Sequence, residues 1–289
     1  MEQKNFTIGV IISTYNNPRW LEKTQGGNLY QTRPADEIVI ADDGSRDDTR
    51  QLIESFKSQL PIKHVWHEDQ GFQKTEILNK AIVAAEADYL IFTDQDCIPR
   101  EDFIATHAHH AEKGYFLSGG YFKLPMDTSL CIAQADVESG NAFRLGWLHE
   151  RGLKYSFKCT KLFRCPFYAW LLNHITPARA SWNGCNASGW RADALAVNGF
   201  NEQMHYGGED REFGERLVNL GLRSKQLRYS AILLHLDHKR PYKNKDEIEK
   251  NGASRKNTRR QRIIETPNGI RKLDAGRHFR KSDLGKTRS

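Results

Sequence analysis

The first hundred residues alternate between short apolar segments and longer segments with helical spacing. The short segments are rich in β-branched residues and comprise Thr7–Ser13, Glu37–Ala41, Ile62–Trp66 and Asp88–Thr93. Between them, apolar residues recur every three to four positions in Arg19–Tyr30, Asp47–Gln59 and Lys74–Ala87. This alternation predicts strand–helix–strand units with right-handed crossovers. Because the strands are almost continuously apolar, we expect an α/β fold whose sheet is covered by helices on both faces.

The second part of the chain is less regular. Helical spacing returns over Glu101–Lys113, and a strand is predicted over Tyr115–Phe122. We expect a further helix over Glu209–Leu220 and a strand over Tyr229–Leu236. Residues 125–180 show no sustained period and carry many aromatic and basic side chains. Two interpretations of this segment are open. It is either an insertion packed on the core or a surface that faces an acceptor or a membrane.

Composition narrows the class of protein. The hydrophobic fraction of 38% and the charged fraction of 27% are ordinary for a globular chain. No apolar run approaches the roughly 18 residues of a membrane span, and the first residues do not resemble a signal peptide. The cysteines lack CxxC spacing, which is typical of reduced thiols rather than a disulfide framework. We therefore expect a cytoplasmic protein.

The net charge of +7 is unevenly distributed. Residues 239–289 contain 17 Lys and Arg against 6 Asp and Glu, so they carry +11 and leave −4 for residues 1–238. Few apolar residues interrupt this basic tail, and we expect it to be poorly ordered unless it is bound. An anionic membrane surface is one expected partner, with the protein peripheral on the inner face of the cytoplasmic membrane. The tail lacks the motifs and interleaved aromatics of a nucleic-acid arm, so no nucleic acid is expected.

Two carboxylates, Asp94 and Asp96, stand at the end of the fourth predicted strand. With one residue between them they leave the strand on the same side. The carboxyl ends of strands in open α/β sheets are where ligands bind, and oxygen ligands suit Mg²⁺ or Mn²⁺ bound with substrate phosphates. The alternative is that both residues only form the turn before Pro99.

Polar or glycine-containing groups also stand at the ends of the first three predicted strands, and three further groups come later in the chain. In chain order the series is Ser13–Asn16, Asp42–Ser45, Asp69–Phe72, Asp94–Asp96, Trp182–Asn186, Gly207–Asp210 and His235–His238. Over roughly residues 6–238 this series resembles the family-2 glycosyltransferases with a GT-A fold, a Rossmann-like, mostly parallel mixed sheet. The second half is similar to the galactosyltransferase-like module of bacterial chondroitin-type polymerases and β-1,4-galactosyltransferases. Asn198–Asn201 followed by Gly207–Asp210 carries that similarity.

The resemblance implies transfer of a sugar from a nucleotide-sugar, usually a UDP-sugar, to a hydroxyl of a glycan or lipid-linked acceptor. The residues that match nucleotide-binding positions are Thr14, Tyr15, Asn16, Asp42, Asp69, Lys74 and Asp94. A buried Asp can accept hydrogen bonds from uracil or ribose, and an aromatic ring can stack on the base. We expect Asp43 and Gly44 to shape a turn instead.

The resemblance also implies a metal site. Asp96 matches the direct metal ligand, whereas Asp94 more often meets the ribose or a metal-bound water. His235 and His238 both fall where related enzymes place a further ligand, and either could bind the metal. An imidazole ligand would favour Mn²⁺ over Mg²⁺.

The acceptor side is implied by the second half of the series. Asp210 matches the general base that deprotonates the acceptor hydroxyl, and Glu209 would hold a hydroxyl of donor or acceptor. Further sugar contacts are expected from Trp182, Asn183, Asn186 and Gly208. For Trp182, packing in the core is the competing interpretation.

The sequence thus predicts an inverting, metal-dependent glycosyltransferase that builds a cell-surface glycan such as lipopolysaccharide or capsule. The expected domain covers residues 1–238, with a nucleotide-sugar half (1–100) and an acceptor half (101–238), followed by the basic tail (239–289). Two alternatives remain open. A nucleotidyltransferase would share the metal carboxylates without needing Asp210 as a base, and a sugar-nucleotide-binding protein would lack turnover.

Overall fold

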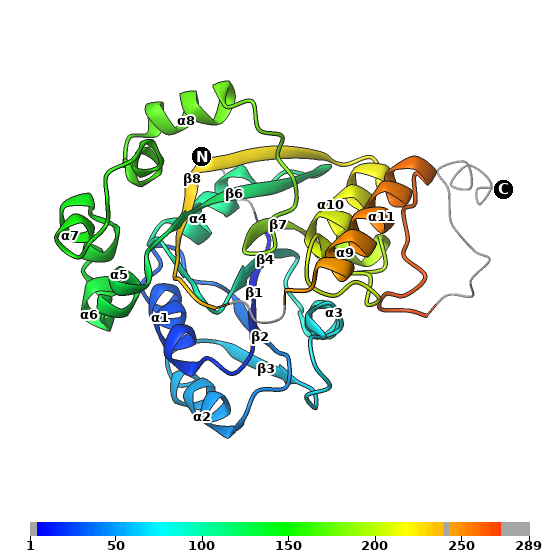
Figure 1. Cartoon of the computed structure of the whole chain (residues 1–289), viewed down its shortest axis with the longest axis horizontal. Coiled ribbons are helices and arrows are strands. Elements are labelled where there is room, and N and C mark those ends of the chain that lie inside the picture. Colours follow the sequence, from blue (N-terminus) through cyan, green and yellow to red (C-terminus); the bar gives the residue numbers. More distant parts are fainter. Residues whose placement is uncertain (1–4, 240–242, 273–289) are drawn as a thin grey trace.

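A mixed sheet of eight strands runs through the computed structural model, which describes residues 5–239 and 243–272 (Figure 1). The strand order is β3-β2-β1-β4-β7-β6-β8-β5. The strands are β1 (Ile8–Thr14), β2 (Glu37–Asp42), β3 (Ile62–Trp66), β4 (Tyr89–Asp94), β5 (Cys97–Pro99), β6 (Tyr115–Lys123), β7 (Asn186–Trp190) and β8 (Arg223–His235).

The first four strands form the parallel part of the sheet, as predicted. β1 pairs with β2 and with β4, and β2 pairs with β3, all in parallel. The crossovers are the helices α1 (Pro18–Leu29), α2 (Asp47–Phe56) and α3 (Lys74–Ala84). The register places Ser13 opposite Asp94 and Thr14 opposite Asp42, so the polar strand ends lie at one edge.

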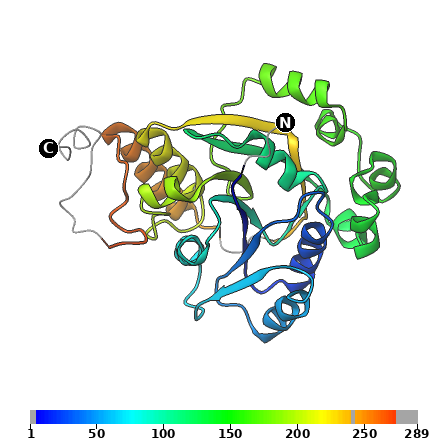
Figure 2. The ribbon, with the colours of Figure 1, turned by 180° about the vertical axis from the view of Figure 1, so that it is seen from behind.

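Helices cover both faces of this sheet. Along β1, Val10 and Ile12 belong to one buried cluster together with residues of α1 and α2, whereas Ile11 belongs to a second cluster with residues of α3. Alternate side chains of a strand point to opposite faces, so an uninterrupted apolar strand requires this two-sided packing. Figure 2, seen from behind, shows α1 and α2 on the side of the sheet opposite to α3.

The rest of the sheet is mixed, and the sequence pattern found it only in part. β7 pairs antiparallel with β4 and β6, β8 runs parallel to β6, and the short β5 pairs antiparallel with β8. β5 and β7 were not predicted, and β8 begins earlier than expected. The helices around these strands are α4 (Phe103–His110), α9 (Arg191–Ala196) and α10 (Glu209–Leu220).

Residues 126–175 are helical rather than irregular. They form α5 (Met126–Cys131), α6 (Gln134–Glu138), the 3₁₀ helix η1 (Asn141–Phe143), α7 (Leu145–Glu150), the 3₁₀ helix η2 (Phe157–Leu162) and α8 (Pro166–Ile175). A third buried cluster, which includes Trp20, Phe122, Phe143 and Leu234, joins most of these helices to α1 and β8. The segment is therefore an insertion packed on the core along one side of the sheet (Figure 1).

Part of the basic tail is ordered, contrary to expectation. α11 (Lys245–Gln261) packs against α10, where Arg255 contacts Glu215 over 2.6 Å and the Thr258 hydroxyl donates to Glu212 over 2.9 Å. The expectation of a poorly ordered tail is wrong for residues 243–272, because ion pairs and hydrogen bonds replace the missing apolar face. Residues 240–242 and 273–289 of the tail lie outside the described residues. Within the described ranges, no helix is long and apolar enough to cross a membrane.

Candidate active site

A cleft of about 760 Å³ opens at the carboxyl ends of β1 and β4. Such a position is the usual ligand site of open α/β sheets. The predicted site residues that line it are Thr14, Tyr15, Asn16, Lys74, Asp94, Asp96, Asn183, Glu209, Asp210, His235 and His238. Residues separated by more than two hundred positions in the sequence thus meet in one cavity.

The end of β1 is fixed by Gln95. The Thr14 hydroxyl donates to Gln95 Oε1 over 2.5 Å, and the Tyr15 N–H donates to the same oxygen over 3.1 Å. The Tyr15 ring is 45% exposed, and its hydroxyl donates to Asp69 over 2.8 Å. Asn16 follows with a left-handed φ of 45° and turns the chain along the cleft. An exposed ring held in this way offers a face for a nucleobase.

Lys74 places a positive charge inside the cleft. Its Nζ donates to Asp94 Oδ1 over 2.6 Å, and the Ser13 hydroxyl donates to the same oxygen over 2.6 Å. Burial alone would lower the pKa of Lys74, but the carboxylates of Asp94, Glu209 and Asp96 outweigh burial and raise it. The ammonium therefore stays charged at neutral pH and is suited to meet a phosphate oxygen.

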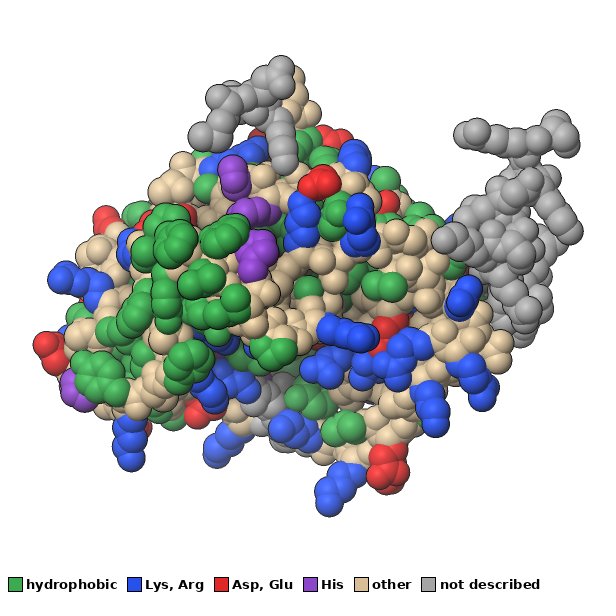
Figure 3. Space-filling model, turned by 90° about the horizontal axis from the view of Figure 1, so that it is seen from above, with side chains coloured by type: hydrophobic (Ala, Val, Ile, Leu, Met, Phe, Trp, Pro, Cys, Tyr) green, Lys and Arg blue, Asp and Glu red, His purple; other side chains and the backbone are tan. Residues whose placement is uncertain are grey.

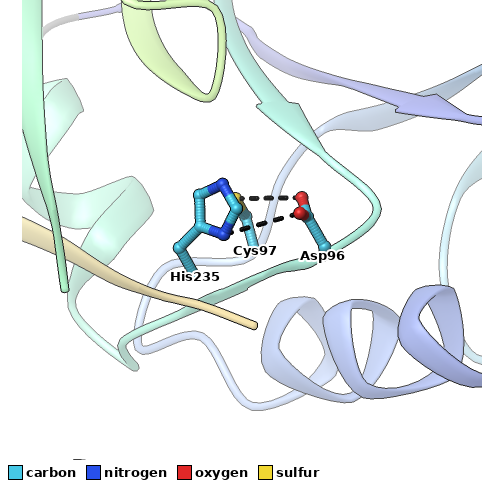
Figure 4. A group of neighbouring side chains, drawn as sticks. All are labelled: Asp96, Cys97 and His235. Atoms are coloured by element: carbon cyan, nitrogen blue, oxygen red, sulfur yellow. Dashed lines mark hydrogen bonds and ion pairs between the residues drawn. The ribbon is translucent and has the colours of Figure 1, made fainter. Parts of the chain in front are cut away.

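Asp96 is 5% exposed and faces two histidines. Its Oδ2 lies 2.9 Å from Nε2 of His238 and 3.5 Å from Nδ1 of His235. Figure 4 shows the carboxylate pointing toward the His235 ring, with Cys97 beside both. Burial acts to raise the pKa of Asp96, but the hydrogen bond from His238 and the nearby positive charges lower it to about 2. Asp96 is therefore ionised at any physiological pH.

The chemistry of this donor set fits a divalent metal. One ligand atom each from Asp96, Cys97 and His235 lie within 4.8 Å of one another, and His238 adds a second imidazole. Burial raises the pKa of the Cys97 thiol, so it remains protonated and is a poor ligand. A carboxylate with two imidazoles suits Mn²⁺ better than Mg²⁺, which prefers oxygen ligands and water.

Two acids, Glu209 and Asp210, lie in the first turn of α10 and line the same cleft. Gly207 and Gly208 precede them with φ of 116° and 98°. Residues that carry a Cβ rarely adopt this backbone conformation. Asp210 Oδ2 accepts the N–H of Gly184 over 3.0 Å, and Glu209 accepts the N–H of Gly207 over 2.8 Å. Burial and the neighbouring Asp210 raise the pKa of Glu209. The positive end of the helix dipole stabilises the Asp210 carboxylate.

Two predicted sugar-binding residues are instead part of the core. Trp182 is 2% exposed and packs edge-on against Phe92 and Phe213 with ring centroids 5.3 and 4.7 Å away. Core packing is thus the correct interpretation of Trp182. Asn186 is fully buried in β7, where its amide donates to the Gly120 carbonyl over 2.7 Å. Neither side chain reaches the cleft, because both pack between strands and helices beneath it.

The positions of two neighbouring aspartates differ from the expected ones. Asp42, predicted to contact the nucleotide, is fully buried, where it accepts the Ser45 N–H over 2.8 Å and lies 2.9 Å from His64 Nε2. Asp43, expected only to shape a turn, lines the cleft and lies 2.7 Å from His67 Nε2. Asp42 ends β2 inside the sheet, whereas Asp43 is the first residue beyond it.

Two other predicted positions are close to the cleft without being part of its wall. Asp69 is exposed and supports the Tyr15 hydroxyl, and Gly208 caps α10 behind Glu209. Sequence reasoning missed several lining residues, namely Asp43, Gln95, Tyr121, Lys123 and Tyr206. Tyr121 and Lys123 stand near the end of the predicted strand Tyr115–Phe122, so the rule that ligands gather at strand ends could have identified them.

Solved structures with the same fold include two glycosyltransferases. The mannosyltransferase PcManGT from Pyrobaculum calidifontis, in complex with GDP-Man and Mn²⁺, has a TM-score of 0.54 at 20% identity, covering 82% of this chain and 59% of that one. S. aureus TarS 1–349 in complex with UDP has a TM-score of 0.57 at 16% identity, covering 86% and 64%. The fold of the chain is therefore GT-A, as the sequence predicted.

Sequence comparison identifies the family. Residues 9–171 match the model of glycosyl transferase family 2, and residues 173–239 match the model described as the N-terminal domain of galactosyltransferase. The chain belongs to glycosyl transferase family 2. The predicted resemblance is confirmed in both halves.

Curated relatives are similar over most of this chain. The validoxylamine A glucosyltransferase of Streptomyces hygroscopicus subsp. limoneus is 30% identical over 232 residues, which is 74% of this chain and 48% of that protein. The chondroitin synthase of Pasteurella multocida (strain Pm70) is 26% identical over 245 residues, which is 75% of this chain and 23% of that protein. The chain thus spans about half the length of the first relative and less of the second.

Proposed function

We propose that the chain transfers a sugar from a nucleotide-sugar donor, a UDP-sugar, to a hydroxyl of a growing cell-surface glycan, with inversion and with a divalent metal. One observation carries the proposal. The cluster of Asp96, His235 and His238 and the acids Glu209 and Asp210 line the same cleft. A leaving-group site and a base site therefore share one cavity, as a single displacement requires.

The donor would lie along the carboxyl ends of β1 and β4. The exposed Tyr15 ring is suited to stack on the base, and Asp43 at the end of β2 is placed to accept a hydrogen bond from it. Lys74 contributes a fixed positive charge for the diphosphate. Within this arrangement we assign residues 1–100 to donor binding and 101–238 to acceptor binding, with residues 243–272 packed behind α10.

Asp96, His235 and His238 would hold the metal. Bound there, a divalent cation would neutralise the charge that develops on the departing diphosphate. Mn²⁺ is the expected ion, because two of the three ligands are imidazoles.

Asp210 would act as the general base. Its carboxylate lies at the positive end of α10 and is oriented by two backbone donors, the Gly184 N–H on Oδ2 and the Arg211 N–H on Oδ1. Each oxygen has a second lone pair, which would accept the proton of the acceptor hydroxyl. One base and one leaving group in a single displacement invert the anomeric centre. Glu209, which lines the cleft beside Asp210, would accept hydrogen bonds from sugar hydroxyls.

The test is nucleotide release from a panel of UDP-sugars and GDP-mannose, with Mn²⁺ or with EDTA. We expect one donor to turn over with Mn²⁺ and to lose turnover with EDTA or in Asp96→Asn. Asp210→Asn should lower the rate by about 10²- to 10⁴-fold, the usual size of general base catalysis, while calorimetry still detects UDP binding. Release of UDP rather than of a sugar 1-phosphate separates sugar transfer from nucleotidyl transfer.

Asp246→Asn is the matched control for Asp210→Asn. Asp246 is also an acid in the first turn of a helix, but it lies in α11 and is exposed. Its substitution should leave the rate unchanged. Absence of turnover with every donor, together with absence of metal-dependent nucleotide binding, would overturn the proposal.

A further inference from the structure

Residues 151–181 differ in charge from the rest of the insertion. They contain six Lys and Arg and no Asp or Glu, whereas residues 125–150 include four acids. The bases Lys154, Lys158, Arg164 and Arg179 are exposed. Such a segment is attracted to an anionic surface and is not attracted to a cationic one.

Large apolar side chains are exposed on the same segment. Phe157 is 73% exposed, Phe167 is 70% exposed and Trp170 is 55% exposed, and Tyr155 and Ile175 are exposed as well. Figure 3 shows hydrophobic side chains gathered on the face of the molecule above α8, with basic side chains around them. Scattered apolar residues are normal on a surface, but a continuous patch of this size marks an interaction site.

The way α8 packs explains the exposure. Only Ala169 and Leu172 of this helix are buried, and together with Tyr229 of β8 they form a small cluster of their own. A second cavity of about 1100 Å³ separates other parts of α8 from α4 and β8. The outer side of α8 therefore has no cover within the described residues, and Phe167 and Trp170 stack on each other there.

The segment also borders the candidate active site. Lys161 of η2 donates to the carbonyl of Tyr121 over 2.9 Å, and Tyr121 lines the cleft. Burial, and to a smaller extent the charges of Arg228 and Lys158, lower the pKa of Lys161 to about 8. A surface that binds this segment would be close to the acceptor side.

The described part of the basic tail offers less free charge than the sequence suggested. Arg255 and Arg259 of α11 both pair with Glu215, and Arg271 pairs with Glu265. Its helix also presents few apolar side chains. The tail segment therefore lacks the combination of apolar and basic side chains that residues 154–179 present.

We propose that residues 154–179 form an interfacial anchor, in which the aromatic side chains of η2 and α8 insert among the headgroups of an anionic lipid bilayer and the surrounding bases contact lipid phosphates. Phe, Tyr and Trp favour the region between headgroups and acyl chains, and Lys and Arg favour anionic lipids. The anchor concerns lipid binding alone and stands independently of the proposed reaction.

Co-sedimentation with vesicles tests the anchor in the absence of donor and acceptor. The full chain should bind phosphatidylcholine vesicles that contain about 30% phosphatidylglycerol, and more salt should weaken binding. The double variant Phe167→Glu/Trp170→Glu should bind them at least about tenfold more weakly. Val83→Glu/Val218→Glu is the matched control, because both valines are 52% exposed on α3 and α10 and the change in charge is the same. This control should bind like the wild type.

Fluorescence quenching by brominated lipids locates the contact. Trp170→Phe keeps an aromatic ring, so it should still bind the vesicles but lose much of the quenching of tryptophan fluorescence. Trp66→Phe, which removes another exposed tryptophan, should leave the quenching unchanged. Circular dichroism and UDP binding by calorimetry would verify that each variant is folded.

Three results would overturn the anchor. They are absence of wild-type binding to anionic vesicles, equal binding by the double variant and its control, and equal quenching in Trp170→Phe and the wild type. If Phe167→Glu/Trp170→Glu changed the oligomeric state in sedimentation velocity without changing vesicle binding, the patch would be a protein interface and the anchor would be excluded.

Discussion

Two groups of aromatic side chains in this molecule have similar composition and opposite surroundings. Phe92, Trp182 and Phe213 pack against one another between the sheet and α10, beneath the candidate active site. Phe167 and Trp170 of α8 are exposed on the insertion. The comparison shows that an aromatic residue beside a predicted motif can be part of the core, while aromatic residues far from any motif can be exposed.

The surroundings of the two groups explain the difference. Trp182 lies just before β7 of the central sheet. It belongs to a buried cluster of apolar residues that includes Phe92 and Phe213. The exposed group belongs to α8, of which only Ala169 and Leu172 are buried, and residues 151–181 around it contain bases and no acids. If this comparison is correct, substitutions around the sheet should destabilise the protein, and similar substitutions in residues 151–181 should not.

The largest effect is expected from truncating one tryptophan of each group. Trp182→Ala removes a large ring from a filled core and should lower the free energy of unfolding by about 3–5 kcal/mol. Trp170→Ala removes an exposed ring and should change it by about 0.5 kcal/mol or less. Urea unfolding followed by circular dichroism measures both. Equal destabilisation by the two variants would contradict the comparison.

The parallel part of the fold could be predicted because the apolar pattern that indicates each strand lies within a few consecutive residues. The strands β1, β2 and β4 are almost continuously apolar, β3 follows at the same spacing, and the structure has these elements within a few residues of the prediction. β5 and β7 could not be predicted in the same way. β5 has only three residues, and β7 reads Asn-Ala-Ser-Gly-Trp, with polar side chains that are buried through hydrogen bonds to distant residues.

The candidate site was predictable to the extent that its residues follow strands or, as with Asp210, match a motif of the family. Asp94, Asp96, Asp210 and the pair His235 and His238 all line the cleft as expected. The direction of a side chain at a strand end was not predictable. A shift of one residue moves a side chain from the cleft to the interior of the sheet, which is why Asp43 lines the cleft and Asp42 does not.

A smaller effect is expected from adding a methyl group in each region. A Cβ at Gly120 would lie 1.9 Å from the carbonyl oxygen of Arg228, at the irregularity where β6 pairs with β8. Gly120→Ala should therefore cost about 2 kcal/mol of unfolding free energy through overpacking. Gly146 of α7 has no atom within 4 Å of such a Cβ, so Gly146→Ala should stabilise by about 0.5–1 kcal/mol. Thermal unfolding of both variants checks the two signs, and a neutral Gly120→Ala would show that the bulge is adaptable.

The smallest effect concerns pH. His107 is fully buried, and burial lowers its pKa from 6.5 to about 3, so it binds fewer protons when folded than when unfolded between these values. Stability should therefore fall as pH falls below 6.5, and His107 should account for about 1 kcal/mol between pH 7 and pH 5.5. Urea unfolding at both pH values should show a flatter pH dependence in His107→Gln. His174→Gln, which replaces an exposed histidine of the insertion, should keep the wild-type slope. Equal slopes of the unfolding free energy against pH in all three proteins would mean that His107 can be protonated in the folded state without cost. The packing of His107 against β7 would then be loose enough to accept the charge.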